Sequence, residues 1–197
     1  MEETLALTAK ITYRTSLSYT NILSNMYGAY WRQGKYQKAK EVSSEELAIH
    51  QKMGWKEMEA SDFLSLATVQ QDLAEYEEAG QNYQKVLAFF DEVLKSPNNR
   101  LVVTILNNWV GLELTRGNYS LCDSLLQRAW QVNALYPENG GETTLYNQNA
   151  LLAGKLAKYA LQDSLEQLAL QKQSPNLATA TLELQPIIII FLATLPI

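Results

Sequence analysis

The sequence is short of the residues on which most catalytic and metal-binding sites are built. Its 197 residues include one cysteine, Cys122, and one histidine, His50. A single cysteine cannot form an internal disulfide, which fits a reducing compartment. A hydrolytic triad and a zinc site both need partners that a lone histidine cannot supply. We therefore predict that the chain is not an enzyme and that it carries no cofactor and no metal ion.

Long runs of one kind of residue are also missing. No run of Lys and Arg is longer than two residues, and the net charge is -5, so the surface would repel a nucleic acid. The amino terminus carries acids where a signal peptide would carry positive charge. The apolar run at 186–197 has 12 residues, whereas a membrane span needs about 20. We expect a cytoplasmic protein with no nucleic-acid partner and no membrane span.

What the sequence does contain is a repeat. Tyrosines spaced by 40, 43 and 40 residues head four similar segments: Tyr36, Tyr76, Tyr119 and Tyr159. Three positions after each tyrosine stands a small or medium residue: Ala39, Ala79, Cys122 and Gln162. Eleven positions after it stands a large apolar one: Leu47, Leu87, Trp130 and Leu170. Self-similarity at such a period is typical of stacked helical repeats.

Each tyrosine is preceded by a segment with apolar residues at helical spacing, such as Ile22, Met26 and Tyr30. Small residues stand two positions before the tyrosines: Gly34, Ala74, Gly117 and Ala157. Each unit is therefore predicted to be a first helix, helix A, a tight turn, and a second helix, helix B. We place the pairs at 18–52, 56–95, 100–135 and 142–173, with a lone helix B at 2–15 and the start of a helix A at 177–185.

The physics of such a unit explains its residue types. One hairpin cannot bury its own apolar face, whereas stacked hairpins share a continuous core. The small position allows close helix packing, and the large position fills the space between units. Gln162 is large for its place, so we expect looser packing in the fourth unit. Residues 1–176 are predicted to form the repeat array, and 177–197 a partial repeat or an apolar C-terminal tail.

The stretch YGAYWRQGKYQKA at 27–39, supported by YEEAGQNYQKVL at 76–87, resembles the tetratricopeptide repeat family. The period exceeds the usual ~34 residues and is similar to the longer subtype of kinesin light chains and of bacterial arrays attached to caspase-like proteases. The third and fourth units depart from the pattern, because Cys122 and Gln162 replace the alanine. The resemblance implies an all-α, right-handed superhelical solenoid of antiparallel helix pairs, with about four full repeats and partial units at both ends.

The resemblance also implies a concave groove, lined by helices A, that binds a protein or peptide. The positions that the family pattern assigns to it are Asn21, Asn25, Gly28 and Arg32, then Ser61, Ser65, Thr68 and Asp72, then Thr104, Asn107, Asn108, Gly111 and Thr115, and finally Thr144, Asn147, Gln148 and Lys155. An asparagine amide offers both a donor and an acceptor to an extended backbone. The competing interpretation is that these are ordinary solvated or inter-helix polar residues. Too few Lys and Arg stand here to grip a terminal carboxylate. Trp31 is the candidate aromatic anchor.

Other notable side chains have simpler interpretations. We expect His50 to lie on the surface near a helix end, and Cys122 to be buried and unreactive. Packing explains Trp109 and Trp130, which fall on core positions. The acidic pairs at 45–46 and 77–78 are predicted to be solvated helix faces.

The function that follows is a protein- or peptide-binding scaffold. The alternative is a regulatory or sensor arm of a larger protein, a caspase-like protease or a transcription regulator, of which this chain is a fragment. In either case the uncapped ends of the array favour self-association.

Overall fold

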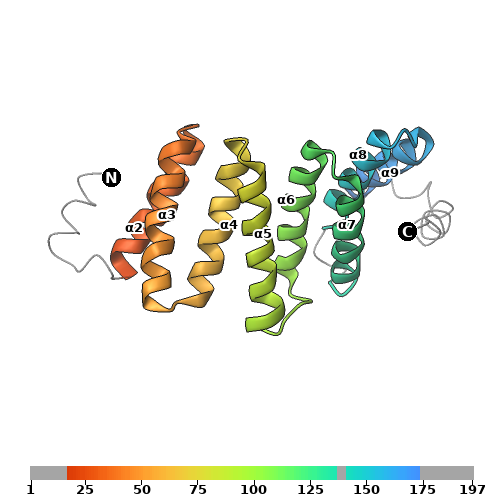
Figure 1. Cartoon of the computed structure of the whole chain (residues 1–197). Coiled ribbons are helices and arrows are strands. Elements are labelled where there is room, and N and C mark those ends of the chain that lie inside the picture. Colours follow the sequence, from red (N-terminus) through yellow and green to blue (C-terminus); the bar gives the residue numbers. More distant parts are fainter. Residues whose placement is uncertain (1–16, 137–140, 174–197) are drawn as a thin grey trace. The chain divides into compact units, whose positions relative to one another are not determined.

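The computed structural model describes residues 17–136 and 141–173, and within them every regular element is helical (Figure 1). The first two helix pairs are α2 (Leu17–Arg32) with α3 (Tyr36–Met53), and α4 (Lys56–Asp72) with α5 (Tyr76–Ala88), which continues into the π-helical turn η1 (Phe89–Val93). The next two are α6 (Arg100–Arg116) with α7 (Tyr119–Asn133), and α8 (Glu142–Lys155) with α9 (Tyr159–Gln173). The predicted all-α class and the four predicted helix pairs are confirmed. No helix in these ranges is long and apolar enough to cross a membrane.

The turns inside the four pairs share one backbone geometry. The small residue before each tyrosine has positive φ, at 68° in Gly34, 60° in Ala74, 77° in Gly117 and 57° in Ala157. The next backbone N–H then reaches back to a carbonyl five residues earlier: Lys35 to Tyr30, Glu75 to Gln70, Asn118 to Glu113, and Lys158 to Ala153, at 2.8 to 2.9 Å. This bond satisfies a carbonyl at the end of helix A that would otherwise lack a partner.

The chain folds as two compact units, one ending at Leu112 and one beginning at Glu113, both within α6. In the first unit α2, α3, α4 and α5 pack in consecutive pairs. Ala39, Ala67 and Ala79 are fully buried there, as the predicted close helix packing requires. Larger side chains fill the space around them, among them Leu23 and Tyr83.

In the second unit α7 packs on α8, and α8 on α9. Tyr146, Ala150, Ala153, Leu165, Leu168 and Ala169 form its core cluster. The Trp130 and Tyr146 rings meet edge to face with their centroids 4.9 Å apart, so a helix B residue contacts the helix A of the next pair. Gln162 is accommodated because it lies over Gly154 of α8, where a Cβ atom would stand 2.5 Å from its side-chain oxygen.

The large apolar residue eleven positions after the tyrosine is buried or half-buried in three of the four repeats. Leu87 is buried and Leu47 and Trp130 are half-buried, but Leu170 is 62% exposed, so the prediction that it faces the core is wrong. Leu168 and Ala169 face α8, and at 100° per residue Leu170 points elsewhere. Trp130 at the matching place is covered by the next helix A, whereas α9 is the last described helix. The predicted partial units at 2–15 and 177–185 and the tail at 177–197 lie outside the described residues.

Candidate peptide-binding face

The predicted groove positions lie on the outward side of each helix A, and most are open to solvent. Exposed side chains are Asn21, Asn25, Trp31, Arg32, Ser61, Asp72, Thr104, Asn108, Thr115, Thr144, Asn147 and Lys155. Half-buried positions are Gly28, Ser65, Thr68, Gly111 and Gln148. Asn107, one position before Asn108 on the helix, is buried at 9% exposure, so little of its side chain is accessible to a ligand in the free chain. We call the exposed and half-buried set the helix-A face.

Two hydrogen bonds connect α2 and α4 on this face. The Tyr27 hydroxyl donates to the backbone oxygen of Ser65 at 3.1 Å, and the Trp31 Nε1–H donates to Asp72 at 2.6 Å. Trp31 stays 39% exposed, as expected of an anchor, but its polar edge is held by Asp72. The ring face is therefore the part of Trp31 that a ligand would contact.

A pocket of about 220 Å³ opens between α2 and α4. Asn21 and Ser61 stand at its exposed rim, and Glu46, His50 and Asp62 line it and are almost completely buried, at 5%, 3% and 4% exposure. We call it the acidic pocket. Its chemistry comes from three helices, because α2 supplies Ser24, α3 supplies Glu46 and His50, and α4 supplies Asp62.

The three inner side chains are close enough to act together. His50 Nδ1 lies 2.6 Å from an Asp62 oxygen, and the Ser24 hydroxyl donates to Glu46. One candidate ligand atom from each of Glu46, His50 and Asp62 lies within 4.8 Å of the others. The second ring nitrogen, His50 Nε2, is buried and has no hydrogen-bond partner within residues 17–136 and 141–173. A buried polar atom without a partner is unusual and points to a missing one.

Burial changes the protonation of this cluster. Loss of water around Glu46 raises its pKa to about 7, against the lowering effect of the Ser24 hydrogen bond. Burial, with the nearby Glu59 charge, likewise raises the pKa of Asp62 to about 7. Burial lowers the pKa of His50, although Glu46 and Glu59 oppose that shift. The pKa values of both carboxyl groups are therefore raised toward neutral pH, so burial favours their protonated forms.

The sequence analysis missed this cluster. His50 was expected on the surface and Glu46 on a solvated face, and both predictions are wrong because both are buried; Glu45, Glu77 and Glu78 are exposed as expected. A signal was present in the spacing. Ala39, Ser43, Glu46 and His50 are separated by four, three and four residues, which puts them on one stripe of α3, and that stripe is its buried side. The stripe was overlooked because three of its members are polar.

A second pocket, of about 340 Å³, lies between α4, η1 and α6. Its walls are mainly apolar and include Leu64, Phe89, Phe90, Leu94, Leu101 and Ile105, with the predicted groove residue Thr104 beside them. We call it the apolar pocket. The π-helical turn forms one wall: Leu94 N–H bonds to the Phe89 oxygen at 3.0 Å, a five-residue step. Turns of this kind are frequent at functional sites.

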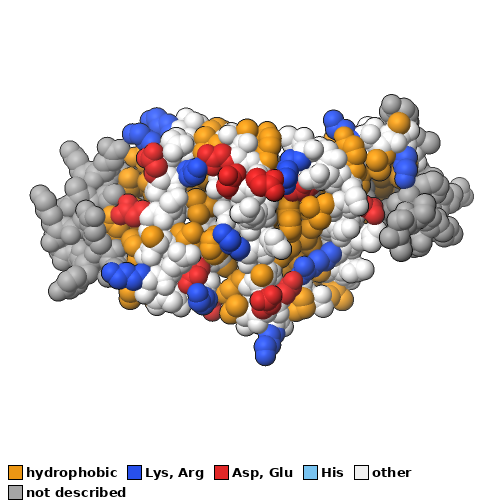
Figure 2. Space-filling view, viewed as in Figure 1, with side chains coloured by type: hydrophobic (Ala, Val, Ile, Leu, Met, Phe, Trp, Pro, Cys, Tyr) orange, Lys and Arg blue, Asp and Glu red, His pale blue; other side chains and the backbone are white. Residues whose placement is uncertain are grey.

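Cys122 and Trp109, two other residues considered in the sequence analysis, have structural roles. Cys122 is buried, as predicted, and burial together with Glu113 raises the pKa of its thiol to about 11, which disfavours the reactive thiolate. Trp109 stacks on Tyr83 with ring centroids 6.4 Å apart. On the described part of the surface in Figure 2, acidic and basic side chains are interspersed.

Comparison with known proteins rests on structure alone. No protein-family model matches the sequence, and no curated protein matches it. BtubC (BKLC) from P. vanneervenii superposes with a TM-score of 0.73 at 19% identity, covering 81% of this chain and 65% of that one. A protein from Podosopora anserina described as a kinesin light chain with nearly identical TPR-like repeats superposes with a TM-score of 0.75 at 17% identity, covering 90% and 86%.

The chain has a tetratricopeptide-like fold. At these identities the likeness establishes the fold and not the ligand. It confirms the predicted resemblance to repeats of the kinesin light chain type. The chain spans about two thirds of the length of BtubC.

Proposed function

We propose that the chain is a scaffold that binds a protein or peptide segment along its helix-A face. The observation that supports this most directly is the accessible set of amides and hydroxyls on that face, flanked in the first unit by two pockets. Such groups can pair with the backbone of an extended segment, and the pockets can receive its side chains. The tetratricopeptide-like fold, in which helix pairs present one surface, is consistent with this role.

The same geometry favours binding over catalysis. A hydrolytic triad needs a hydrogen bond from the serine to the histidine, but the Ser24 hydroxyl donates to Glu46, while His50 Nδ1 is engaged by Asp62. The serine–histidine contact of a triad is therefore not formed among these described residues. Incubating the purified chain with ester and peptide substrates should give no turnover above that of an Asp62→Asn variant.

The test of the proposal is capture of partners by the immobilised chain. Replacing Asn25, Asn108 and Asn147 together by alanine should weaken capture by roughly tenfold or more, since each lost hydrogen bond costs about 1 kcal/mol. The matched control replaces three exposed glutamines on helices B, Gln37, Gln81 and Gln131, and should leave capture unchanged. Equal capture by both triple variants would reject the helix-A face as the binding surface.

Self-association is a separate part of the proposal. Leu170 is a large apolar side chain at 62% exposure on the last described helix, where a further repeat or a second copy would cover it. Changing Leu170 to Lys should reduce any dimer seen by light scattering. An unchanged molecular mass would remove this surface from consideration.

A further inference from the structure

The acidic and apolar pockets lie on either side of one helix. Ser61 of α4 lines both. From the same helix, Met58, Asp62 and Ser65 line the acidic pocket, and Glu57, Ala60 and Leu64 line the apolar one. At 100° per residue these two groups occupy adjacent sides of α4, with Ser61 between them and exposed. One ligand crossing α4 would therefore reach both pockets.

No Lys or Arg among the described residues supplies a cation to the acidic pocket. Within the described part of the chain, neither Glu46 nor Asp62 pairs with a Lys or Arg, and the ammonium group of Lys56, on the same helix as Asp62, bonds Glu59 at 2.9 Å. Buried carboxylates without a cation are costly to fold unless they take up protons. A positively charged group would replace those protons and supply the missing partner.

His50 adds a second reason to expect a donor in this pocket. When an ionised Asp62 accepts from Nδ1–H, the neutral imidazole carries its lone pair on Nε2, which has no partner among the described residues. A guanidinium or ammonium group can donate to this nitrogen and to the carboxylates at once.

The size of the pocket favours a side chain over a bare ion. A volume of about 220 Å³ corresponds to roughly seven water molecules at about 30 Å³ each. That is ample for the aliphatic stem and charged head of Lys or Arg. The half-exposed Met58 at 37% exposure and Tyr27 in the wall offer contact to the stem.

The apolar pocket favours an uncharged, apolar group, in contrast to the acidic pocket. Leu64, Phe89, Phe90 and Leu94 surround about 340 Å³, enough for one large aliphatic or aromatic side chain. An α-helix with its side chains is about 10 Å across, and an extended chain advances about 3.3 Å per residue. The two side chains would therefore stand about three residues apart on the ligand.

We propose that the two pockets are neighbouring subsites for one extended peptide, the acidic pocket taking a Lys or Arg side chain and the apolar pocket a large apolar side chain about three residues away. This inference rests on the proposed binding role of the helix-A face and specifies its ligand.

Fluorescence anisotropy with labelled synthetic peptides tests the pairing. The probes are Gly/Ser host peptides that carry Arg and Phe three residues apart, in both orders. In the control peptides, citrulline or Glu replaces Arg, or Ser replaces Phe. We expect one order to bind best. Replacing Arg by citrulline or Glu should weaken the affinity of that peptide by roughly thirtyfold or more, because a desolvated charge pair is broken. Replacing Phe by Ser should weaken its affinity by roughly tenfold.

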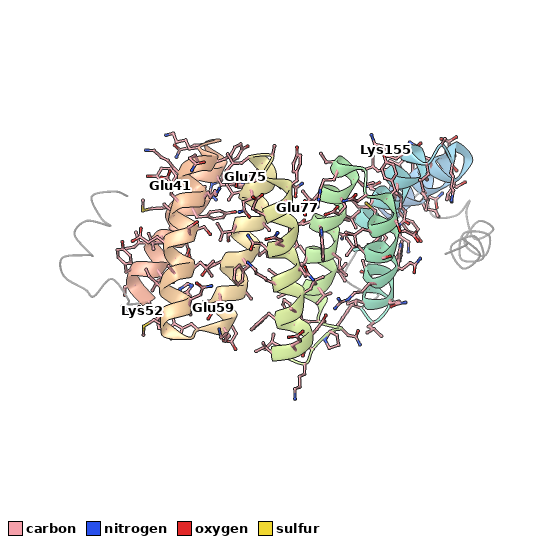
Figure 3. The ribbon with its side chains drawn as sticks, viewed as in Figure 1. Glu41, Lys52, Glu59, Glu75, Glu77 and Lys155 are labelled. Carbon is pink, nitrogen blue, oxygen red and sulfur yellow. The ribbon has the colours of Figure 1, made fainter. Side chains whose placement is uncertain are left out.

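Substitutions in the chain show which pocket is responsible for each loss of peptide affinity. Asp62→Asn and Glu46→Gln should weaken the Arg peptide strongly and leave the citrulline peptide nearly unchanged, a comparison that does not depend on equal stability. Leu101→Ser, at a site 55% exposed, should affect only peptides that carry Phe. Glu41→Gln is the matched charge control, because Glu41 lies on α3 toward the end opposite Lys52 (Figure 3) and does not line the acidic pocket.

The outcomes separate this inference from the proposed function. If peptides bind through the helix-A face with no preference for Arg over citrulline, the subsites are wrong while the scaffold role stands. If no peptide binds and the asparagine variants capture partners as the wild type does, both fail. If Zn²⁺ alone raises the melting temperature, if His50→Gln abolishes that effect, and if Arg peptides do not compete, the acidic pocket is a metal site and the proposal is overturned.

Discussion

Ordinary helix spacing places Glu46, His50 and Asp62 at an interface between helices. Such interfaces are usually apolar, whereas these three side chains are ionisable. Replacing them by apolar residues would stabilise the helix packing, because buried ionisable groups lose hydration that hydrogen bonds only partly restore. Sites that bind often keep such unfavourable groups at a cost in stability. The cluster therefore makes a prediction about stability that does not depend on knowing the ligand.

Glu46→Gln should remove part of the pH dependence of folding. The folded-state pKa of Glu46, about 7, lies above its ordinary value of 4.5, so the folded chain holds this proton more tightly than the unfolded chain. The stabilisation is complete below pH 4.5 and is lost as pH rises to about 7. At pH 8 the variant should exceed the wild type in free energy of unfolding by on the order of 2 kcal/mol, with little difference near pH 4.

Urea unfolding between pH 4 and 8 measures this difference. Asp62, His50, Glu59 and Lys56 are the charged or titratable groups near the site, and all four are present in both proteins, so subtracting the two curves leaves mainly the contribution of Glu46. Glu41→Gln, on the same helix but exposed, controls for the change in net charge. A variant that is less stable than the wild type at pH 8 and equal to it at pH 4 would show that Glu46 is stabilised as a carboxylate.

At the scale of the elements, the turn between helix A and helix B is the most regular feature. All four turns use a residue with positive φ, but two of them place alanine there, at Ala74 and Ala157. Left-handed backbone costs a residue with a Cβ about 1–2 kcal/mol, and glycine escapes that cost. Part of the stability gained by placing glycine at such a turn is offset, because glycine loses more backbone conformational freedom on folding than other residues do.

Exchanging the residues at two equivalent turns tests this account. Ala74→Gly should raise the free energy of unfolding by up to about 1 kcal/mol, and Gly34→Ala should lower it by about the same amount. No atom stands within 4 Å of a Cβ built on Gly34, so crowding does not contribute. Denaturation at equilibrium gives both values, and changes of the same sign in the two variants would contradict the backbone explanation.

Helix boundaries could be predicted from the sequence because they depend on local information. Apolar spacing, the small residue before each tyrosine and the breakers between units placed four helix pairs to within a few residues. The π-helical turn at Phe89–Val93 could not be predicted, because FFDEV is compatible with a continued α-helix. Asn107 and Asn108 differ in burial although they are the same residue type, since only the packing of α6 separates them. The acidic pocket was missed because it joins polar residues of three helices.

For the whole molecule, charge is the property that distinguishes among partners. The chain carries 21 acidic and 16 basic side chains, for a net charge of -5. The long-range field and the acidic pocket therefore both favour a basic ligand. The two effects are separable, because long-range attraction acts on the rate of encounter and a desolvated pair acts on the lifetime of the complex.

The association rate of the Arg and Phe peptide should fall by roughly tenfold between 20 and 500 mM salt, while its dissociation rate changes much less. The reason is that the screening length shrinks from tens of ångströms at low salt to a few ångströms near 1 M, whereas a buried pair is little screened. Stopped-flow fluorescence gives both rates. The citrulline peptide serves as the control, with a shallower dependence because it lacks the charge. Equal slopes for the two peptides, or a salt effect confined to dissociation, would mean that the field of the chain does not guide its ligand and that selectivity resides in the pocket contacts alone.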